Sequence, residues 1–289
     1  MQIGCHGLVW TGIYDADGIR RAVTKTRQAG FDLIEFPLMD PFAFDVATAR
    51  NALDENGMAA TGSLGLSTAT DISSEDEGAV RAGEELLNRA VDVLAELGSG
   101  HLCGIVYSAM CKYMAPATDK GIANSLAVIG RIAERAEQAS LRVSLEVANR
   151  YETNVLNTAR QAREFASAVG HRNVSVHLDT YHMNIEETDM FSPVLDTADR
   201  LGYVHVGESH RGYLGTGSVD FHSFFTALTR IGYDGPIVFE SFSSAVVAPD
   251  LSRMLGIWRN LWTDNDELGA HANRFIRDML VSLASIRHH

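Results

Sequence analysis

The chain has 289 residues, of which 46% are hydrophobic and 21% are charged. Its 24 basic and 37 acidic side chains give a formal net charge of −13 without a basic cluster, so phosphate backbones would be repelled and we expect no nucleic-acid partner. No apolar stretch approaches the roughly 20 residues that a membrane span needs. The first residues also lack the basic region and apolar core of a secretory signal. We therefore expect a cytoplasmic protein with no membrane partner.

Short apolar runs typical of β-strands alternate with helical patterns about eight times along the chain. The runs lie near residues 2–9, 31–36, 58–65, 101–107, 142–147, 174–179, 202–206 and 236–241. Between them, apolar side chains recur at three- to four-residue steps, as at Leu87, Val91 and Leu94, which indicates helices with one core-facing stripe. No linker rich in Pro, Gly or Ser divides the chain. We therefore predict an α/β fold with a single domain over residues 1–289, a (β/α)8 TIM barrel.

A further helical segment follows the eighth predicted strand, from about residue 250 to 289. It carries apolar and aromatic side chains, among them Leu255, Trp258 and Trp262. So much apolar surface after barrel closure predicts that this C-terminal segment packs on the barrel exterior or against a partner subunit.

Four strand-like runs in the second half of the chain end in an acidic or imidazole side chain: Glu146, Asp179, His205 and Glu240. Taken singly, a charged residue at a strand end is usually solvated or ion-paired. In a parallel barrel, however, these strand ends share one mouth, where three carboxylates would repel one another without a cation. A ligand set rich in oxygen and without thiolate favours Mn²⁺, Mg²⁺ or Co²⁺ over a structural zinc. The sequence therefore predicts one divalent metal site, with Mn²⁺ as the expected ion.

Three longer segments around these residues resemble a known family. They are residues 145–152 (LEVANRYE), 178–187 (LDTYHMNIEE) and 205–211 (HVGESHR). They are similar to the ketose 3-epimerases, which include D-tagatose, D-allulose (D-psicose) and L-ribulose 3-epimerases, within the xylose isomerase-like TIM barrel superfamily. The resemblance covers essentially the whole chain, more firmly after residue 140.

The resemblance implies a role for each matching residue. Glu146, Asp179, His205 and Glu240 would bind the divalent ion, and the sugar would be bound near its carbonyl end by Glu152, His182 and Arg211. The first four strand ends follow the family pattern less closely, and their candidates for substrate contacts are His6, Trp10, Glu35, Gly65, Tyr107 and Met110. For Trp10 and Met110, packing at the barrel rim is an equal alternative.

Inversion of a carbon next to a ketone requires one group that removes a proton and a second group that returns a proton on the other face. The resemblance implies that Glu146 and Glu240 are this pair, and the direction of reaction decides which of them is the base. The metal would polarise the ketone and stabilise the cis-enediolate. Epimerisation at C3 of a free ketose of the D-fructose/D-allulose, D-tagatose/D-sorbose or L-ribulose/L-xylulose type is therefore expected.

Other functions remain as alternatives. An aldose–ketose isomerase of the same superfamily would share the metal but move a proton between C1 and C2. A metal-dependent endonuclease for damaged DNA would need further ligands and a basic face, and a sugar-binding module would keep the ligands without turnover. The apolar C-terminal segment and the resemblance suggest a homodimer or a homotetramer.

Overall fold

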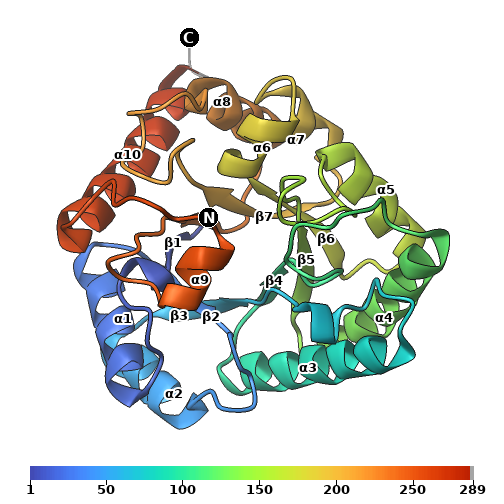
Figure 1. The fold of residues 1–289 in the computed structure, drawn as a ribbon. Coiled ribbons are helices and arrows are strands. Elements are labelled where there is room, and N and C mark those ends of the chain that lie inside the picture. The colour runs from blue at the N-terminus through green and yellow to red at the C-terminus, as the bar shows by residue number, and fades with distance from the viewer. Residues whose placement is uncertain (287–289) are drawn as a thin grey trace.

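The fold is a closed barrel of parallel strands surrounded by helices, in a computed structural model that describes residues 1–286 (Figure 1). Within these residues the barrel consists of β1 (Ile3–His6), β2 (Leu33–Pro37), β3 (Ala59–Ser63), β4 (His101–Gly104), β5 (Arg142–Glu146), β6 (Val174–Asp179), β7 (Leu201–Val206) and β8 (Ile237–Phe239). Each strand pairs with the next, and β8 pairs with β1, where Ile3 lies opposite Ile237. The prediction of a (β/α)8 TIM barrel is confirmed.

Helices cover the outside of the barrel in chain order (Figure 1). They are α1 (Ala16–Gln28), α2 (Val46–Asn56), α3 (Glu77–Glu96), α4 (Asp119–Gln138), α5 (Ala159–Val169), α7 (Ser192–Asp196), α8 (Phe221–Ile231) and α10 (Asn265–Ile286). The apolar stripe predicted for α3 is buried, with Leu87, Val91 and Leu94 at most 1% exposed. Side-chain caps fix several helix starts; Thr158 forms a capping box with Gln161 at α5. No helix in residues 1–286 is long and apolar enough to cross a membrane.

The C-terminal segment contains α10 and a shorter helix, α9 (Pro249–Met254). α10 lies between α8 and α1 and completes the ring of helices (Figure 1). Lys25 of α1 pairs with Asp266 of α10, and Asn273 donates to the main-chain oxygen of Ala29 at 2.9 Å. α10 therefore packs on the barrel exterior. A role of the segment in subunit contacts and the single-domain organisation over 1–289 stay predictions, and residues 287–289 lie outside the described part.

Two strands in the first half are shorter than the sequence pattern predicts. The first ends at His6, because Gly7–Val9 form a 3₁₀ turn in which the His6 Nδ1 accepts the N–H of Leu8 at 3.2 Å. The fourth ends at Gly104, whose φ of +107° favours glycine. A Cβ there would lie 2.4 Å from the main-chain oxygen of Leu64. These breaks decide which side chains of the first half reach the barrel mouth.

Candidate active site

The four side chains predicted as metal ligands converge at the carboxyl end of the barrel. Glu146 ends β5, Asp179 ends β6, His205 lies in β7 and Glu240 directly follows β8. One ligand atom from each lies within 4.8 Å of the others, and all four residues are buried. The Nδ1 of His205 lies 3.5 Å from the Oε1 atoms of both Glu146 and Glu240 and 3.9 Å from Asp179 Oδ2. The arrangement places the four donors around one point.

Two atoms of this group, His205 Nδ1 and Asp179 Oδ2, are buried without a hydrogen-bond partner in the described structure. A buried polar atom left unpaired costs about 1–3 kcal/mol, so native proteins rarely keep two of them side by side without a use. A divalent cation bound among three carboxylates and one imidazole would satisfy both atoms. The residues present therefore fit a single divalent metal ion.

Carboxylates dominate the electrostatics of the site. Burial raises the pKa of Glu146. Burial also acts to raise the pKa of Asp179, but Arg211 and the neighbouring imidazoles outweigh it and hold that pKa well below its usual range. For His205, burial alone would lower the pKa, yet Glu35 and Glu240 raise it well above its usual value. The site therefore attracts a positive charge.

Arg211 closes one side of the ligand group. Its Nη1 lies 2.7 Å from Glu240 Oε2 and 3.2 Å from Asp179 Oδ2. The guanidinium group lies over the ring of Tyr181 at 4.0 Å and near the ring of Phe242 at 5.2 Å. Its backbone has a φ of +59°, a left-handed conformation that costs a non-glycine residue roughly 1–2 kcal/mol. Such strain is typical of functional positions.

His182 and Glu152 are held by one amide, that of Asn149. The Asn149 Nδ2 donates to Glu152 Oε1 at 2.9 Å and lies 2.8 Å from the Nδ1 of His182, which also accepts the N–H of Asn149. Because Nδ1 is the acceptor, the proton of a neutral His182 is on Nε2, which lies 3.7 Å from Glu146 Oε1 and 3.8 Å from Asp179 Oδ2. Asn149 lies in the motif at 145–152, but residue spacing alone does not predict a role for it.

A cavity of about 290 Å³ opens above the ligand group. Six of the predicted substrate-contact residues line it: His6, Gly65, Met110, Glu152, His182 and Arg211. The opposite wall is apolar and includes Leu251, Met254 and Leu255, from α9 and the residue after it. The sequence predicts only a packing role for the segment from about residue 250, because a helical pattern does not show that a short helix lies at the barrel mouth.

Comparison with known proteins agrees with this geometry. The chain is 71% identical over 289 residues to a ketose 3-epimerase from Arthrobacter globiformis, with 100% of both chains covered. It is 51% identical to an L-ribulose 3-epimerase from Methylomonas sp., covering 96% of this chain and 97% of the relative. The chain belongs to the ketose 3-epimerases. It is thus an enzyme of the isomerase class.

The wider family and the known structures agree with this assignment. The xylose isomerase-like TIM barrel family matches residues 23–273. The crystal structure of a D-allulose 3-epimerase from Methylomonas sp. in complex with D-allulose superimposes with a TM-score of 0.95 at 51% identity, covering 96% of this chain and 97% of that one.

Three candidates for substrate contacts in this ketose 3-epimerase, Trp10, Glu35 and Tyr107, do not line the cavity, so the structure gives no support for direct substrate contact by them. Tyr107 is fully buried, and its hydroxyl donates to the main-chain oxygen of Glu146 at 2.8 Å, so that it supports the end of β5. The turn after His6 carries Trp10 toward α10, where a Cβ on Gly269 would lie 2.3 Å from its ring.

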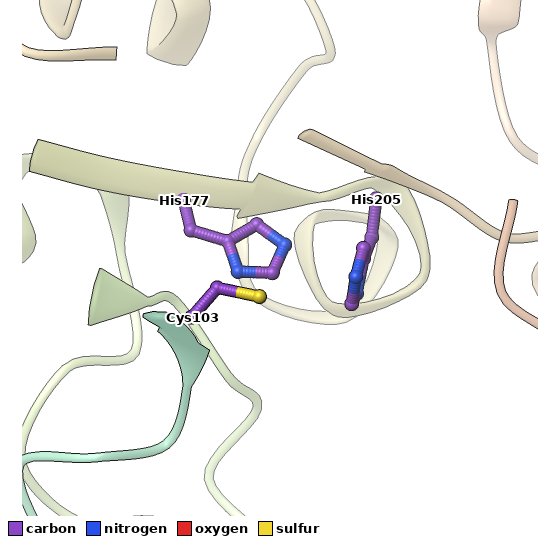
Figure 2. Close-up of side chains that lie close together, drawn as sticks. All are labelled: Cys103, His177 and His205. Carbon is purple, nitrogen blue, oxygen red and sulfur yellow. The ribbon is translucent and has the colours of Figure 1, made fainter. Parts of the chain in front are cut away.

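A second group of potential ligands in the epimerase consists of Cys103 on β4, His177 on β6 and His205 on β7, whose side chains lie close together (Figure 2). Burial raises the pKa of the Cys103 thiol, which therefore stays protonated, and this thiol donates to the main-chain oxygen of Gly62 at 3.4 Å. His205 already uses Nε2 in a hydrogen bond to Glu35 at 2.8 Å. We therefore interpret this group as packing beneath the active site.

Proposed function

We propose that this ketose 3-epimerase inverts C3 of a free ketose with one divalent metal ion, which Glu146, Asp179, His205 and Glu240 would bind. The observation that carries the proposal is the convergence of these four donors, two of which, Asp179 Oδ2 and His205 Nδ1, lack a hydrogen-bond partner in the described structure. Mn²⁺ is the expected ion, and Mg²⁺ and Co²⁺ are alternatives. When bound, the ion would polarise the ketone and stabilise the negative charge that follows proton loss.

Glu146 and Glu240 are proposed as the acid/base pair. They approach the ligand group from β5 and from the end of β8, so that a ketose between them would present C3 to one carboxylate on each face. One glutamate would remove the proton from C3, and the other, protonated beforehand, would donate its proton to the opposite face. The direction of reaction would decide which glutamate has which role.

Three further side chains are proposed to orient the sugar. Arg211 is a permanent cation and a fixed donor to substrate oxygens. His182 offers an Nε2–H, because Asn149 occupies its Nδ1. Glu152, held by the same Asn149 amide, can accept a sugar hydroxyl. The apolar wall from α9 would exclude water from the reacting carbons.

The substrate class follows from the relatives. Their names give L-ribulose and D-psicose as substrates, and one related structure contains D-allulose. We therefore propose free ketohexoses and ketopentoses as substrates. A homodimer or homotetramer and a cytoplasmic location stay predictions from the sequence.

The decisive test is chromatography of D-fructose after incubation with metal-stripped protein, with and without Mn²⁺. We expect D-allulose only in the sample that contains Mn²⁺, and D-tagatose and L-ribulose should give their own C3 epimers. A D-glucose or D-mannose peak would instead support the aldose–ketose isomerase. No product from any ketose, in protein that binds Mn²⁺, would leave only a sugar-binding role.

A further inference from the structure

Glu35 is a buried carboxylate that the proposed mechanism does not use. It lies on β2 and is 0% exposed, and it is absent from the cavity wall, so it is not placed to touch a substrate. A buried charge is costly unless hydrogen bonds compensate it. Its Oε2 accepts hydrogen bonds from Tyr203 Oη at 2.7 Å and from His205 Nε2 at 2.8 Å. Its other oxygen, Oε1, lies 3.4 Å from Nε2 of His6, which lines the cavity. Any effect of Glu35 on the site is therefore exerted through His205, Tyr203 and His6.

The bond to His205 fixes which nitrogen of that ring is free. An ionised carboxylate can only accept, so the His205 Nε2 must carry a proton. In the neutral ring the lone pair is then on Nδ1, the atom that faces Glu146, Asp179 and Glu240. A ring with the proton on Nδ1 could not bind a metal through that atom.

A second hydrogen bond holds the carboxylate itself in place. Tyr203 donates its only hydroxyl proton to Glu35, so the hydroxyl of Thr61, 2.6 Å away, must be the donor to Tyr203. The order of donation runs from Thr61 to Tyr203 to Glu35. All three residues are buried on β3, β7 and β2, beneath the mouth.

We propose that Glu35 is a positioning residue, which sets the tautomer and ring orientation of His205 so that Nδ1 faces the metal position. The inference rests on the proposed metal site, but not on ketose turnover. Partners that orient a ligating histidine typically contribute about 10–100-fold to metal affinity. Glu35 on β2, in the first half of the barrel, would thus orient the ligand His205 on β7 through a hydrogen bond.

The test measures Mn²⁺ binding to metal-stripped protein by calorimetry, without substrate. Glu35→Gln can present either an acceptor oxygen or a donor NH₂ group to His205 Nε2, so it no longer enforces the tautomer. We therefore expect an affinity about 10–100-fold weaker than in the wild type. At saturating Mn²⁺ the KM for the ketose should stay within about twofold, because Glu35 does not reach the cavity. An affinity within twofold of the wild type in folded Glu35→Gln would overturn the proposal.

The matched control is Asp71→Asn. Asp71 is also a buried carboxylate that accepts a tyrosine hydroxyl, from Tyr113 at 2.6 Å. Its other partners are the N–H and hydroxyl groups of Ser73 and the N–H of Ala109, none of which is a predicted ligand. This variant should lose stability and keep its Mn²⁺ affinity. A loss of Mn²⁺ affinity equal to that of Glu35→Gln would show a general effect of core polarity and would overturn the proposal.

Tyr203→Phe decides the question if Glu35→Gln does not fold. It removes one hydrogen bond to Glu35 and keeps the bond to His205, so we expect Mn²⁺ binding to weaken by a smaller, several-fold factor. Unchanged affinity would overturn the proposal.

If the wild type binds Mn²⁺ but turns over no ketose, the proposed function fails, while the effect of Glu35→Gln on binding still tests this inference.

Discussion

The two halves of the barrel supply different parts of the cavity. The strands β5 to β8 and the loops after them provide the charged groups: Glu146, Glu152, Asp179, His182, His205, Arg211 and Glu240. The strands β1 to β4 and their loops provide mostly apolar side chains, among them Leu8, Leu38, Met39, Leu64, Leu66 and Met110. The charged groups therefore come mainly from the second half, whereas the apolar wall comes from the first half and from α9 after β8. Substitutions of charged groups and of wall residues should have different effects on kcat and KM.

The largest effect is expected in the second half, from Glu240→Gln. The amide has nearly the same shape but cannot exchange the proton, so kcat should fall by roughly 10²–10⁴-fold. The measurement is ketose turnover at saturating Mn²⁺, with circular dichroism to verify the fold. Wild-type activity in a verified preparation would remove Glu240 from the acid/base pair.

A smaller effect is expected when Arg211 is replaced. Loss of a charged donor costs about 1.5–3 kcal/mol, so Arg211→Ala should raise KM by roughly 10–100-fold and affect kcat less. Arg211→Gly is the matched variant, because it also lacks the guanidinium but tolerates the φ of +59°. It should have the same KM and be more stable than Arg211→Ala by about 1 kcal/mol. An unchanged KM in both variants would contradict a role in sugar binding.

A substitution in the first half of the barrel should change substrate preference rather than Mn²⁺ binding. Met110 lies against Gly65 in the cavity wall, where a Cβ on Gly65 would be 3.1 Å from the Met110 sulfur. Met110→Ala enlarges this wall, and we expect it to change the ratio of kcat/KM between a ketohexose and a ketopentose by about 10-fold. Its Mn²⁺ affinity should stay at the wild-type value. Equal losses for both sugars would contradict the division between the halves.

The smallest effect on activity is expected from His101 in β4, away from the mouth. Burial lowers its pKa from the usual 6.5 to about 4. The unfolded chain therefore binds a proton more readily, so stability is complete above pH 6.5 and falls as the pH drops toward 4. The loss reaches about 3 kcal/mol at most. His101→Gln should reduce this acid sensitivity, as measured by urea unfolding at a series of pH values.

The sequence was sufficient to predict that Glu146, Asp179, His205 and Glu240 lie close together. Each of them lies at or beside the end of a strand, and parallel strands bring these ends together. It was insufficient where the backbone turns. The 3₁₀ turn after His6 takes Trp10 away from the cavity, and no apolar pattern distinguishes that turn from three more residues of strand. The roles of Asn149 and Glu35 depend on hydrogen bonds between distant segments, which residue spacing does not encode.

Closure of the barrel makes the two ends of the sequence neighbours in space. β8 pairs with β1, and α10 is fixed to α1 through Lys25 and Asp266. Contacts between such distant parts of a chain form late in folding, because a long loop must close first. During synthesis Glu240 and α10 emerge after nearly all other elements, so a nascent chain cannot complete the ligand group early. We expect the first tight uptake of Mn²⁺ on a ribosome-bound chain only after α10 has left the exit tunnel.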